Sequence, residues 1–357
     1  MKIMFSGGGT LGPVVPLVAI AEIYKKHDPK ARFAWVGTKN GPERQLVAGY
    51  GIPFYAITSG KLRRYFSLFN ISDAFKLCWG FFQSLVLLWQ EKPDILISAG
   101  GFTSVPLHWA GAALGIPQWI HQQDLQIGLA NRLMSRSAKK ITTALRDCAA
   151  FFPEKKTEWI GNPVRNLEVK NKSDAYRSLG LPAGAPVIFA LGGGTGSSSV
   201  NKLVLEAVPG LPKDWQIVHL VGRERPSELQ ERAARTFPNY HVYQFFTEEM
   251  KYAYAVADVV VARAGFATIT ELAALAKPSV LVPMSGTHQE INAKMLVENK
   301  AAIVMREKTD NGLKLAHIIR ELMAHPEVRD YLGRKLREIL PPAPPDKIIS
   351  IIEDLTS

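Results

Sequence analysis

The same four residues, Gly-Gly-Gly-Thr, occur twice in the chain, at 7–10 and at 192–195. Each copy follows a short apolar run with the length of a buried strand and precedes a segment with helical spacing of apolar residues. A glycine turn between strand and helix lets a ligand approach the backbone and directs free N–H groups and the helix dipole at negative charge. The repeat therefore predicts two similar domains, each presenting a glycine loop to an anionic group.

Strand and helix patterns alternate in both halves of the 357-residue chain, a length that suits two domains. This order predicts two α/β domains with parallel sheets and crossover helices. The polar segment 165–174 is the expected linker, so the expected domains span 1–164 and 165–340, and a last helix within 341–357 packs back on the first domain. The clearest expected strands are 32–38, 94–101, 117–123, 139–145, 215–222 and 240–246, with a helix near 104–114.

The formal net charge of +11 favours an anionic partner such as a phosphorylated substrate, an anionic lipid or a nucleic acid. No motif that combines basic and aromatic residues supports nucleic-acid binding, and we expect no nucleic-acid partner. The two cysteines, Cys78 and Cys148, make no disulfide framework, which favours a reducing compartment. Residues 1–20 lack the form of a signal peptide, because glycines interrupt their apolar stretch. The longest apolar window, 78–89, is too short to span a bilayer.

Several well-defined site motifs are absent from the sequence. Gly7, Gly9 and Gly12 satisfy G-x-G-x-x-G, but the second expected strand ends in Gly37-Thr38 rather than in the acid that binds a dinucleotide ribose. There is no P-loop, no H-E-x-x-H or zinc-type Cys/His spacing, and no G-x-S-x-G elbow. The sequence therefore predicts neither a metal ion nor a nicotinamide or flavin cofactor.

Seven segments together resemble glycosyltransferase family 28, from the first strand to about residue 340: GGTLGPVVPLVAIA, SAGGFTSVPLHWAGAALGIP, HQQDLQIGLANR, GNPVR, LGGGTG, ARAGFATITELAALAKP and THQEINA. The resemblance implies the GT-B fold, in which two Rossmann-like domains face each other across a cleft. It also implies transfer of N-acetylglucosamine (GlcNAc) from UDP-GlcNAc to the N-acetylmuramic acid (MurNAc) 4-hydroxyl of undecaprenyl-pyrophosphoryl-MurNAc-pentapeptide. The implied reaction inverts the sugar configuration and uses no metal ion.

A sugar-nucleotide donor needs its diphosphate neutralised as it leaves. Backbone N–H groups in the second glycine loop, or at the helix start after Gly265, provide this without a cation. The resemblance implies that Phe246 offers its backbone to uracil and that the Glu271 carboxylate holds the ribose diol. The full implied donor set is Arg165, Gly193, Gly194, Thr195, Phe246, Met250, Gly265, Phe266, Ala267, Thr268, Glu271, His288, Gln289 and Asn292.

Some of these donor residues have a structural alternative. Thr268-x-x-Glu271 and Thr287-x-x-Glu290 both have the form of a helix capping box. Asn292 is equally suited to helix packing. Arg263, at an expected strand end beside the donor loop, fits a surface ion pair as well as a role at the donor.

On the acceptor side the chain departs from the family pattern. The family loop G-G-T-G-G-H reads G-G-T-L-G-P at 8–13, and H-E-Q-N reads H-Q-Q-D at 121–124. An inverting transfer needs a base for the attacking hydroxyl, and Pro13 cannot serve. Asp124 and His121 are the candidate bases, with a buried hydrogen-bonding role as the alternative for each. The implied acceptor-binding residues are Gly9, Thr10, Gly12, Gly101, Thr103, Ser104 and Asn131.

The segment 60–94 is too rich in large apolar residues for an ordinary amphipathic core helix. Its stripe Phe75, Cys78, Phe82, Leu85 and Trp89 lies near basic residues, as in a helix that lies in the plane of an anionic membrane surface. A long core helix and an oligomer contact are the alternatives. The expected membrane contacts are Arg63, Arg64, Phe66, Phe69, Phe75, Lys76, Trp79 and Phe82.

These observations predict a UDP-sugar-dependent transferase, bound peripherally at the cytoplasmic face of the bacterial inner membrane. Its expected partners are a UDP-sugar donor, an undecaprenyl-linked acceptor, anionic lipid and other cell-wall enzymes. Two alternatives remain open. One is a relative that uses the same kind of donor with a different acceptor, and the other is a non-catalytic paralogue that binds nucleotide or lipid.

Overall fold

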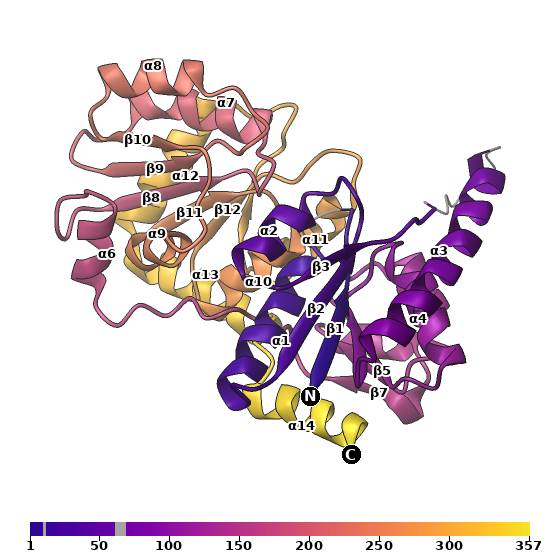
Figure 1. Cartoon of the computed structure of the whole chain (residues 1–357). Coiled ribbons are helices and arrows are strands. Elements are labelled where there is room, and N and C mark those ends of the chain that lie inside the picture. The colour runs from indigo at the N-terminus through magenta and orange to yellow at the C-terminus, as the bar shows by residue number, and fades with distance from the viewer. Residues whose placement is uncertain (10–11, 61–68) are drawn as a thin grey trace. The chain divides into compact units, whose positions relative to one another are not determined.

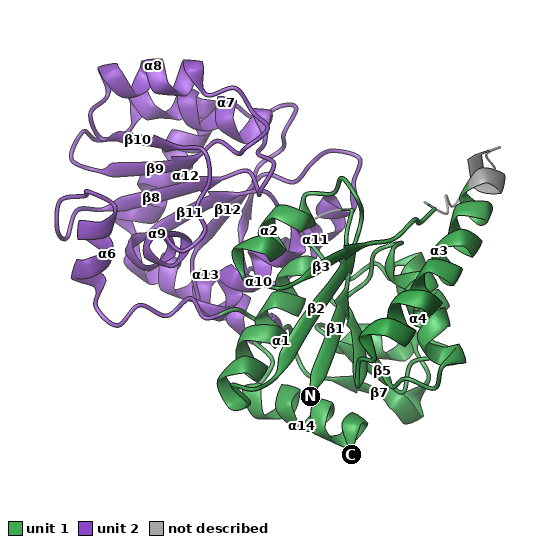
Figure 2. Cartoon of the chain, in the orientation of Figure 1, with its two compact units in different colours: residues 1–165, 342–357 green, residues 166–341 purple. Residues whose placement is uncertain are grey.

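The computed structural model describes residues 1–9, 12–60 and 69–357 (Figure 1). The chain divides into two compact units, residues 1–165 with 342–357, and residues 166–341 (Figure 2). The expected domain ends, 164 and 340, each lie one residue before the observed junctions at 165 and 341. The expected linker 165–174 is helical at its end, because Asn171 caps a helix that begins at Lys172.

Unit 1 contains a seven-stranded sheet with the strand order β3-β2-β1-β4-β5-β6-β7, and its neighbouring strands are parallel. The order reverses between β1 and β4, which is the switch point where ligands bind in doubly wound sheets. The strands are β1 (Lys2–Ser6), β2 (Arg32–Gly37), β3 (Phe54–Ala56), β4 (Ile95–Ser98), β5 (Gln118–Gln122), β6 (Lys140–Thr143) and β7 (Thr157–Trp159).

Unit 1 contains six α-helices among the described residues, together with two short 3-10 turns. Strands β1 and β4 are almost entirely buried, which is why their sequences are nearly continuous apolar runs, whereas the equally buried β5 carries the polar residues Gln118, His121 and Gln122. The helices are α1 (Val14–His27), α2 (Glu43–Gly49), α3 (Phe69–Glu91), α4 (Ser104–Ala113), α5 (Leu129–Met134) and α14 (Pro345–Thr356), and the 3-10 turns are η1 (Arg146–Phe151) and η2 (Glu154–Lys156).

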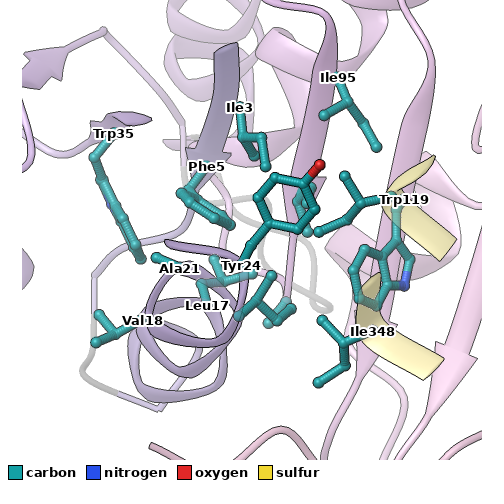
Figure 3. Close-up of a cluster of buried hydrophobic side chains, with 14 of the residues drawn as sticks. Ile3, Phe5, Leu17, Val18, Ala21, Tyr24, Trp35, Ile95, Trp119 and Ile348 are labelled. Carbon is teal, nitrogen blue, oxygen red and sulfur yellow. The ribbon is translucent and has the colours of Figure 1, made fainter. Parts of the chain in front are cut away.

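Helix α14 packs against the core of unit 1. Ile348 lies in the same buried cluster as Tyr24 of α1 and Trp119 of β5 (Figure 3). The chain that leads to this helix is fixed to the sheet edge, where the Ala343 N–H donates to the Asn162 carbonyl at 2.9 Å. The C-terminal tail therefore forms a helix that packs on unit 1.

Unit 2 contains a six-stranded sheet, also with parallel neighbours, in the order β10-β9-β8-β11-β12-β13. Its switch point lies between β8 and β11. The strands are β8 (Val187–Leu191), β9 (Gln216–Leu220), β10 (Tyr240–Tyr243), β11 (Val259–Ala262), β12 (Ser279–Leu281) and β13 (Ile303–Val304). The helices are α6 (Lys172–Ser178), α7 (Ser198–Ala207), α8 (Glu228–Thr236), α9 (Met250–Val256), α10 (Phe266–Ala274), α11 (His288–Glu298), α12 (Gly312–Ala324) and α13 (Pro326–Ile339), with a 3-10 turn η3 (Val208–Gly210).

Candidate functional site

The second glycine loop lies between β8 and α7, at the switch point of the unit 2 sheet. Gly193 has φ +87°, and the loop is half-exposed from Gly192 to Thr195. Within the described part of the chain, the N–H groups of Gly193, Gly194 and Thr195 donate no hydrogen bond, whereas Gly196 N–H donates to the Gly193 carbonyl at 3.0 Å. Since α7 begins directly after this loop, these amides and the helix N-terminus suit an anionic group.

The first glycine loop has a different hydrogen-bonding arrangement. The Gly7 N–H donates to the Val36 carbonyl at 3.2 Å, and the Gly9 N–H donates to Glu43 Oε2 at 3.2 Å. The Glu43 carboxylate, fully buried in the first turn of α2, also accepts from the amide of Thr38 at 2.7 Å and from its hydroxyl. The Gly9 amide therefore has an internal partner with a carboxylate beside it, and the binding of an anion by this loop stays a prediction.

Glu43 is not among the residues predicted from the sequence. The dinucleotide motif requires an acid at the end of the second strand, whereas Glu43 comes six residues after the last residue of β2, Gly37. The available signal was an acid at the start of the helix that follows that strand. Of the other acceptor candidates in this loop, Thr10 lies outside the described residues, and Gly12 lies two residues before α1.

A second loop of unit 1, after β4, packs against the first. A Cβ atom on Gly101, which has φ +97°, would lie 3.0 Å from both N and O of Gly8. Ser104 begins α4, and its hydroxyl donates to the Gly100 carbonyl at 3.1 Å. Thr103 is buried. The structure thus brings four of the candidates together beyond the carboxyl ends of the central strands β1 and β4: Gly9, Gly101, Thr103 and Ser104.

His121 is fully buried in β5 and has partners on both ring nitrogens. Nε2 lies 2.7 Å from Asn162 Oδ1, and Nδ1 lies 2.8 Å from the Thr142 hydroxyl. Burial lowers the pKa of His121 to about 4, although the bond to Asn162 opposes this shift. The structure contradicts the candidate role of His121 as a base, because a buried imidazole with two internal partners does not reach a substrate hydroxyl. It supports the buried hydrogen-bonding alternative.

Asp124 is half-buried in the loop that follows β5, and protein contacts fix its backbone. The Gln122 side-chain amide donates to the Asp124 carbonyl at 2.7 Å, and the Cys148 thiol lies 3.6 Å from the same oxygen. Asn131 donates to Gln122 Oε1 at 2.7 Å. Asn131 therefore helps to order this loop through Gln122. Asp124 remains the candidate base, on a loop whose backbone these contacts hold in place.

Glu271 lies inside α10 and is buried. Its Oε2 accepts from the Tyr254 hydroxyl at 2.9 Å. The N-cap of α10 is Gly265, so Thr268 is an internal helical residue and the capping-box alternative for Thr268 and Glu271 is wrong. Tyr254, on α9, is a partner that no local motif indicates.

The other donor candidates of unit 2 occupy the loops and helix starts around the same sheet. Thr287 caps α11 by accepting from the Gln289 N–H at 3.3 Å, and Glu290 accepts from the Gly286 N–H at 3.1 Å, so both side chains cap the helix start, although not with the bonds of a capping box. Gln289 Oε1 accepts from the Met284 N–H at 3.0 Å, whereas His288 is exposed. Asn292 is buried and donates to the Ala264 carbonyl at 3.1 Å, which fits its packing alternative.

Phe246, Met250 and Phe266 are buried, and Ala267 is half-exposed on α10. Arg165, half-buried, ends the first segment of unit 1.

Helix α3 carries apolar residues on two faces. Leu77, Leu87 and Leu88 are buried, whereas an exposed apolar stripe runs along the same helix. The stripe consists of Phe75 (74% exposed), Trp79 (61%), Phe82 (60%), Val86 (58%) and Trp89 (71%). The expected stripe is wrong at Leu85, which packs on the core. Lys76 is exposed and pairs with Asp73, Phe69 lies in the first turn of α3, and Arg63, Arg64 and Phe66 lie outside the described residues.

Two features are absent from the described residues. No helix there is both long enough and apolar enough to cross a bilayer. No group of three or more His, Cys, Asp or Glu side chains in those ranges could hold a metal ion.

Two doubly wound parallel units, each with a strand, a glycine loop and a helix at its switch point, define a Rossmann-like α/β protein of the GT-B class. Residues 3–143 match the glycosyltransferase family 28 N-terminal domain, and residues 187–336 match the family's C-terminal domain. The chain belongs to glycosyltransferase family 28. The predicted family and fold class are confirmed.

Curated relatives match over the whole chain. The UDP-N-acetylglucosamine--N-acetylmuramyl-(pentapeptide) pyrophosphoryl-undecaprenol N-acetylglucosamine transferase of Lachnospira eligens is 35% identical, covering 99% of each chain. The protein of the same name from Bacillus pumilus is 31% identical over 100% of each chain. Among solved structures, MurG of Acinetobacter baumannii is similar with a TM-score of 0.73 and 26% identity, covering 99% of both chains.

Proposed function

We propose that this chain transfers GlcNAc from UDP-GlcNAc to the MurNAc 4-hydroxyl of undecaprenyl-pyrophosphoryl-MurNAc-pentapeptide, the step that makes lipid II in peptidoglycan synthesis. The observation that carries the proposal is the likeness along the whole chain to transferases named for this donor and acceptor. The open amide loop of unit 2 supports it, since that loop suits the diphosphate of a sugar nucleotide.

Unit 2 binds the donor in this proposal. The amides of Gly193, Gly194 and Thr195 face the diphosphate and stabilise the negative charge that grows on UDP as the bond to the sugar breaks. Glu271 accepts hydrogen bonds from the ribose hydroxyls, and Tyr254 orients its carboxylate. Phe246 and Met250 flank the uracil, and the segment that includes His288 and Gln289 contacts the sugar.

Unit 1 binds the acceptor, with Gly101, Thr103, Ser104 and Asn131 near its pyrophosphate. Asp124 removes the proton of the attacking 4-hydroxyl. The carboxylate is attached to a loop that Gln122 and Cys148 hold, which keeps its position fixed during transfer. The His121 side chain is held in the core by Thr142 and Asn162 and does not take part in proton transfer.

The direct test is transfer of radiolabelled GlcNAc from UDP-GlcNAc to a lipid I analogue with a shortened prenyl chain. We expect product with inverted configuration at the anomeric carbon. Binding of UDP-GlcNAc without transfer to this analogue would instead favour a different acceptor. Absence of both transfer and hydrolysis of UDP-GlcNAc would favour the non-catalytic paralogue.

Replacement of Glu271 by glutamine is expected to raise the dissociation constant for UDP about tenfold or more, because a charge-assisted hydrogen bond contributes roughly 1.5–3 kcal/mol. Isothermal titration calorimetry with UDP and with uridine measures the effect, and both constants should rise because both ligands carry the ribose. Glu248→Gln, at an exposed acid that pairs with Lys251, is the matched control. An unchanged constant for uridine would refute the ribose assignment.

We further propose that the protein docks peripherally on the cytoplasmic face of the inner membrane through helix α3. The exposed stripe from Phe75 to Trp89 buries its rings at the level of the lipid headgroups. Lys61, Arg63 and Arg64 precede α3 in the sequence, and attraction of basic residues to anionic lipid contributes about 1 kcal/mol each. This location also places the enzyme beside an undecaprenyl-linked acceptor.

The double variant Trp79→Glu with Phe82→Glu is expected to abolish sedimentation of the protein with vesicles of phosphatidylglycerol and phosphatidylethanolamine. Two carboxylates in the stripe both remove apolar area and repel anionic headgroups. Leu229→Glu, at a 68% exposed leucine on α8, is the control and should leave sedimentation unchanged. Equal sedimentation of the double variant and the unmodified chain would contradict docking through α3.

A further inference from the structure

A buried ion pair joins four elements of unit 2. Arg263 follows β11, and its guanidinium pairs with Glu307, which follows β13. The same carboxylate accepts from the Ser199 hydroxyl in the first turn of α7 and from the Ser285 N–H at 2.8 Å in the loop before α11. The side chains of Arg263 and Glu307 are only 8% and 17% exposed. The surface ion pair considered for Arg263 is therefore wrong, because the pair is buried.

The carboxylate of Glu307 is firmly ionised in this setting. Burial alone would raise its pKa, but hydrogen bonds from Arg263, Ser199 and the Ser285 amide, with the charge of Arg263, lower the pKa to about 2. A buried ion pair adds little net stability compared with apolar residues of similar size. We therefore infer the role of the pair from the segments that it connects, and not from its contribution to stability.

The pair fixes the segment that leads into α11. Arg263 donates to the Val282 carbonyl at 3.0 Å, and Glu307 holds Ser285 three residues later. Beyond Ser285, the Thr287 hydroxyl donates to the Met284 carbonyl at 2.8 Å. Gln289 Oε1 accepts from the Met284 N–H at 3.0 Å, so the position of this side chain follows from that of the anchored loop.

The pair also reaches the second glycine loop. Ser199 is the third residue after Gly196, in the helix whose N-terminus follows the open amides. One carboxylate thus connects the helix behind the diphosphate loop to the segment with Gln289. Its two oxygens set the spacing between these two parts, because Oε1 serves Ser199 and Arg263 while Oε2 serves Ser285.

We propose that Glu307 is a positioning residue that sets the distance between the diphosphate loop and the sugar-contacting segment, so that the site distinguishes UDP-GlcNAc from UDP. This inference rests on the proposed function, because that function assigns the diphosphate to residues 193–195 and the sugar to Gln289. Glu307 itself contacts neither part of the donor.

The test compares the dissociation constants of UDP-GlcNAc and of UDP by calorimetry. In Glu307→Gln we expect the constant for UDP-GlcNAc to rise about tenfold, the effect of roughly 1.4 kcal/mol, with the constant for UDP changed less than about twofold. Ser199→Ala removes one hydrogen bond of Glu307 without changing its charge and should shift the ratio in the same direction by a smaller factor. Glu298→Gln, at an exposed acid of α11 that pairs with Lys294, is the matched control.

Glu307→Gln leaves the Arg263 charge unpaired in a buried site, which can prevent folding. The double variant Arg263→Met with Glu307→Leu replaces both charged side chains by apolar ones of similar volume, so it provides the same comparison in a folded chain. A ratio of the two constants equal to that of the unmodified chain, in the double variant and in Ser199→Ala, would overturn the inference while leaving the proposed function intact. Failure of the unmodified chain to bind UDP-GlcNAc would overturn both.

Discussion

Replacement of Asp124 by asparagine is expected to lower kcat for GlcNAc transfer by about 10²–10⁴-fold, the usual contribution of a general base. Asparagine keeps the size of the side chain and one acceptor oxygen, but it cannot take the proton of the acceptor hydroxyl. The contacts of the Asp124 backbone carbonyl with Gln122 and Cys148 do not involve the side chain, so the loop should keep its position. The KM for UDP-GlcNAc should therefore stay within about twofold.

The matched control is Asp147→Asn, because Asp147 is an exposed acid in the 3-10 turn that contains Cys148. Both Asp147 and Asp124 contribute to the raised pKa of Cys148, about 11, after the larger effect of burial. Steady-state rates with the lipid I analogue should be unaffected by the control. If Asp124→Asn transfers at the rate of the unmodified chain, the base lies elsewhere.

The fold could be predicted because its signals are local and strong. Central strands such as β8 and β11 are buried at every position and read as apolar runs, and the glycines that follow β8 mark the turn into α7. These features depend on neighbouring residues alone, so one sequence is enough to reveal them. The helix after the proline-rich stretch 341–345 was expected too, but its packing on unit 1 is a tertiary contact.

The two glycine loops show where this reasoning fails. Their sequences are alike, but the Gly9 amide binds a carboxylate 34 residues further along, whereas the amides at 193–195 have no such partner among the described residues. Whether an amide is available depends on the tertiary fold, which the motif does not contain. The same holds for Glu271, where a local pattern suggested a capping box and the fold supplied Tyr254 instead.

Helix α3 shows a related limit. Its apolar residues cover more than one face, so periodicity could not separate those that meet the core from those that stay exposed. Leu85 and Val86 are neighbours of similar character, and only packing against the sheet decides that Leu85 joins the core while Val86 remains exposed. The ion pair between Arg263 and Glu307 could not be predicted from local patterns in the sequence either, because the two residues are 44 positions apart.

Unit 1 is expected to lose roughly 6 kcal/mol of its free energy of unfolding between pH 6.5 and pH 4, because two buried histidines cannot be protonated in the folded state. Burial lowers the pKa of His108 and of His121 from 6.5 to about 4. The difference between 6.5 and about 4 corresponds to about 3.5 kcal/mol for each histidine, since one pKa unit is about 1.4 kcal/mol. About 3 kcal/mol of this is lost by pH 4, where the folded histidine is half protonated. The sign follows from proton binding: below pH 6.5 the unfolded chain takes up protons at both positions, and the folded chain does so only near pH 4.

Urea unfolding at steps between pH 7 and pH 4.5 measures this slope in a range where most unpaired carboxylates keep their charge. The slope for unit 1 should approach about 2.7 kcal/mol per pH unit, because unfolding takes up two protons. Burial lowers the pKa of His219 in unit 2 to about 3, so the unfolding of that unit takes up one further proton. His27→Gln, at an exposed histidine 3.0 Å from Glu353, is the control and should leave the slope nearly unchanged. A folded state that is equally stable at pH 7 and pH 4.5 would show that water reaches these imidazoles, and it would reopen the question of His121 as a proton acceptor.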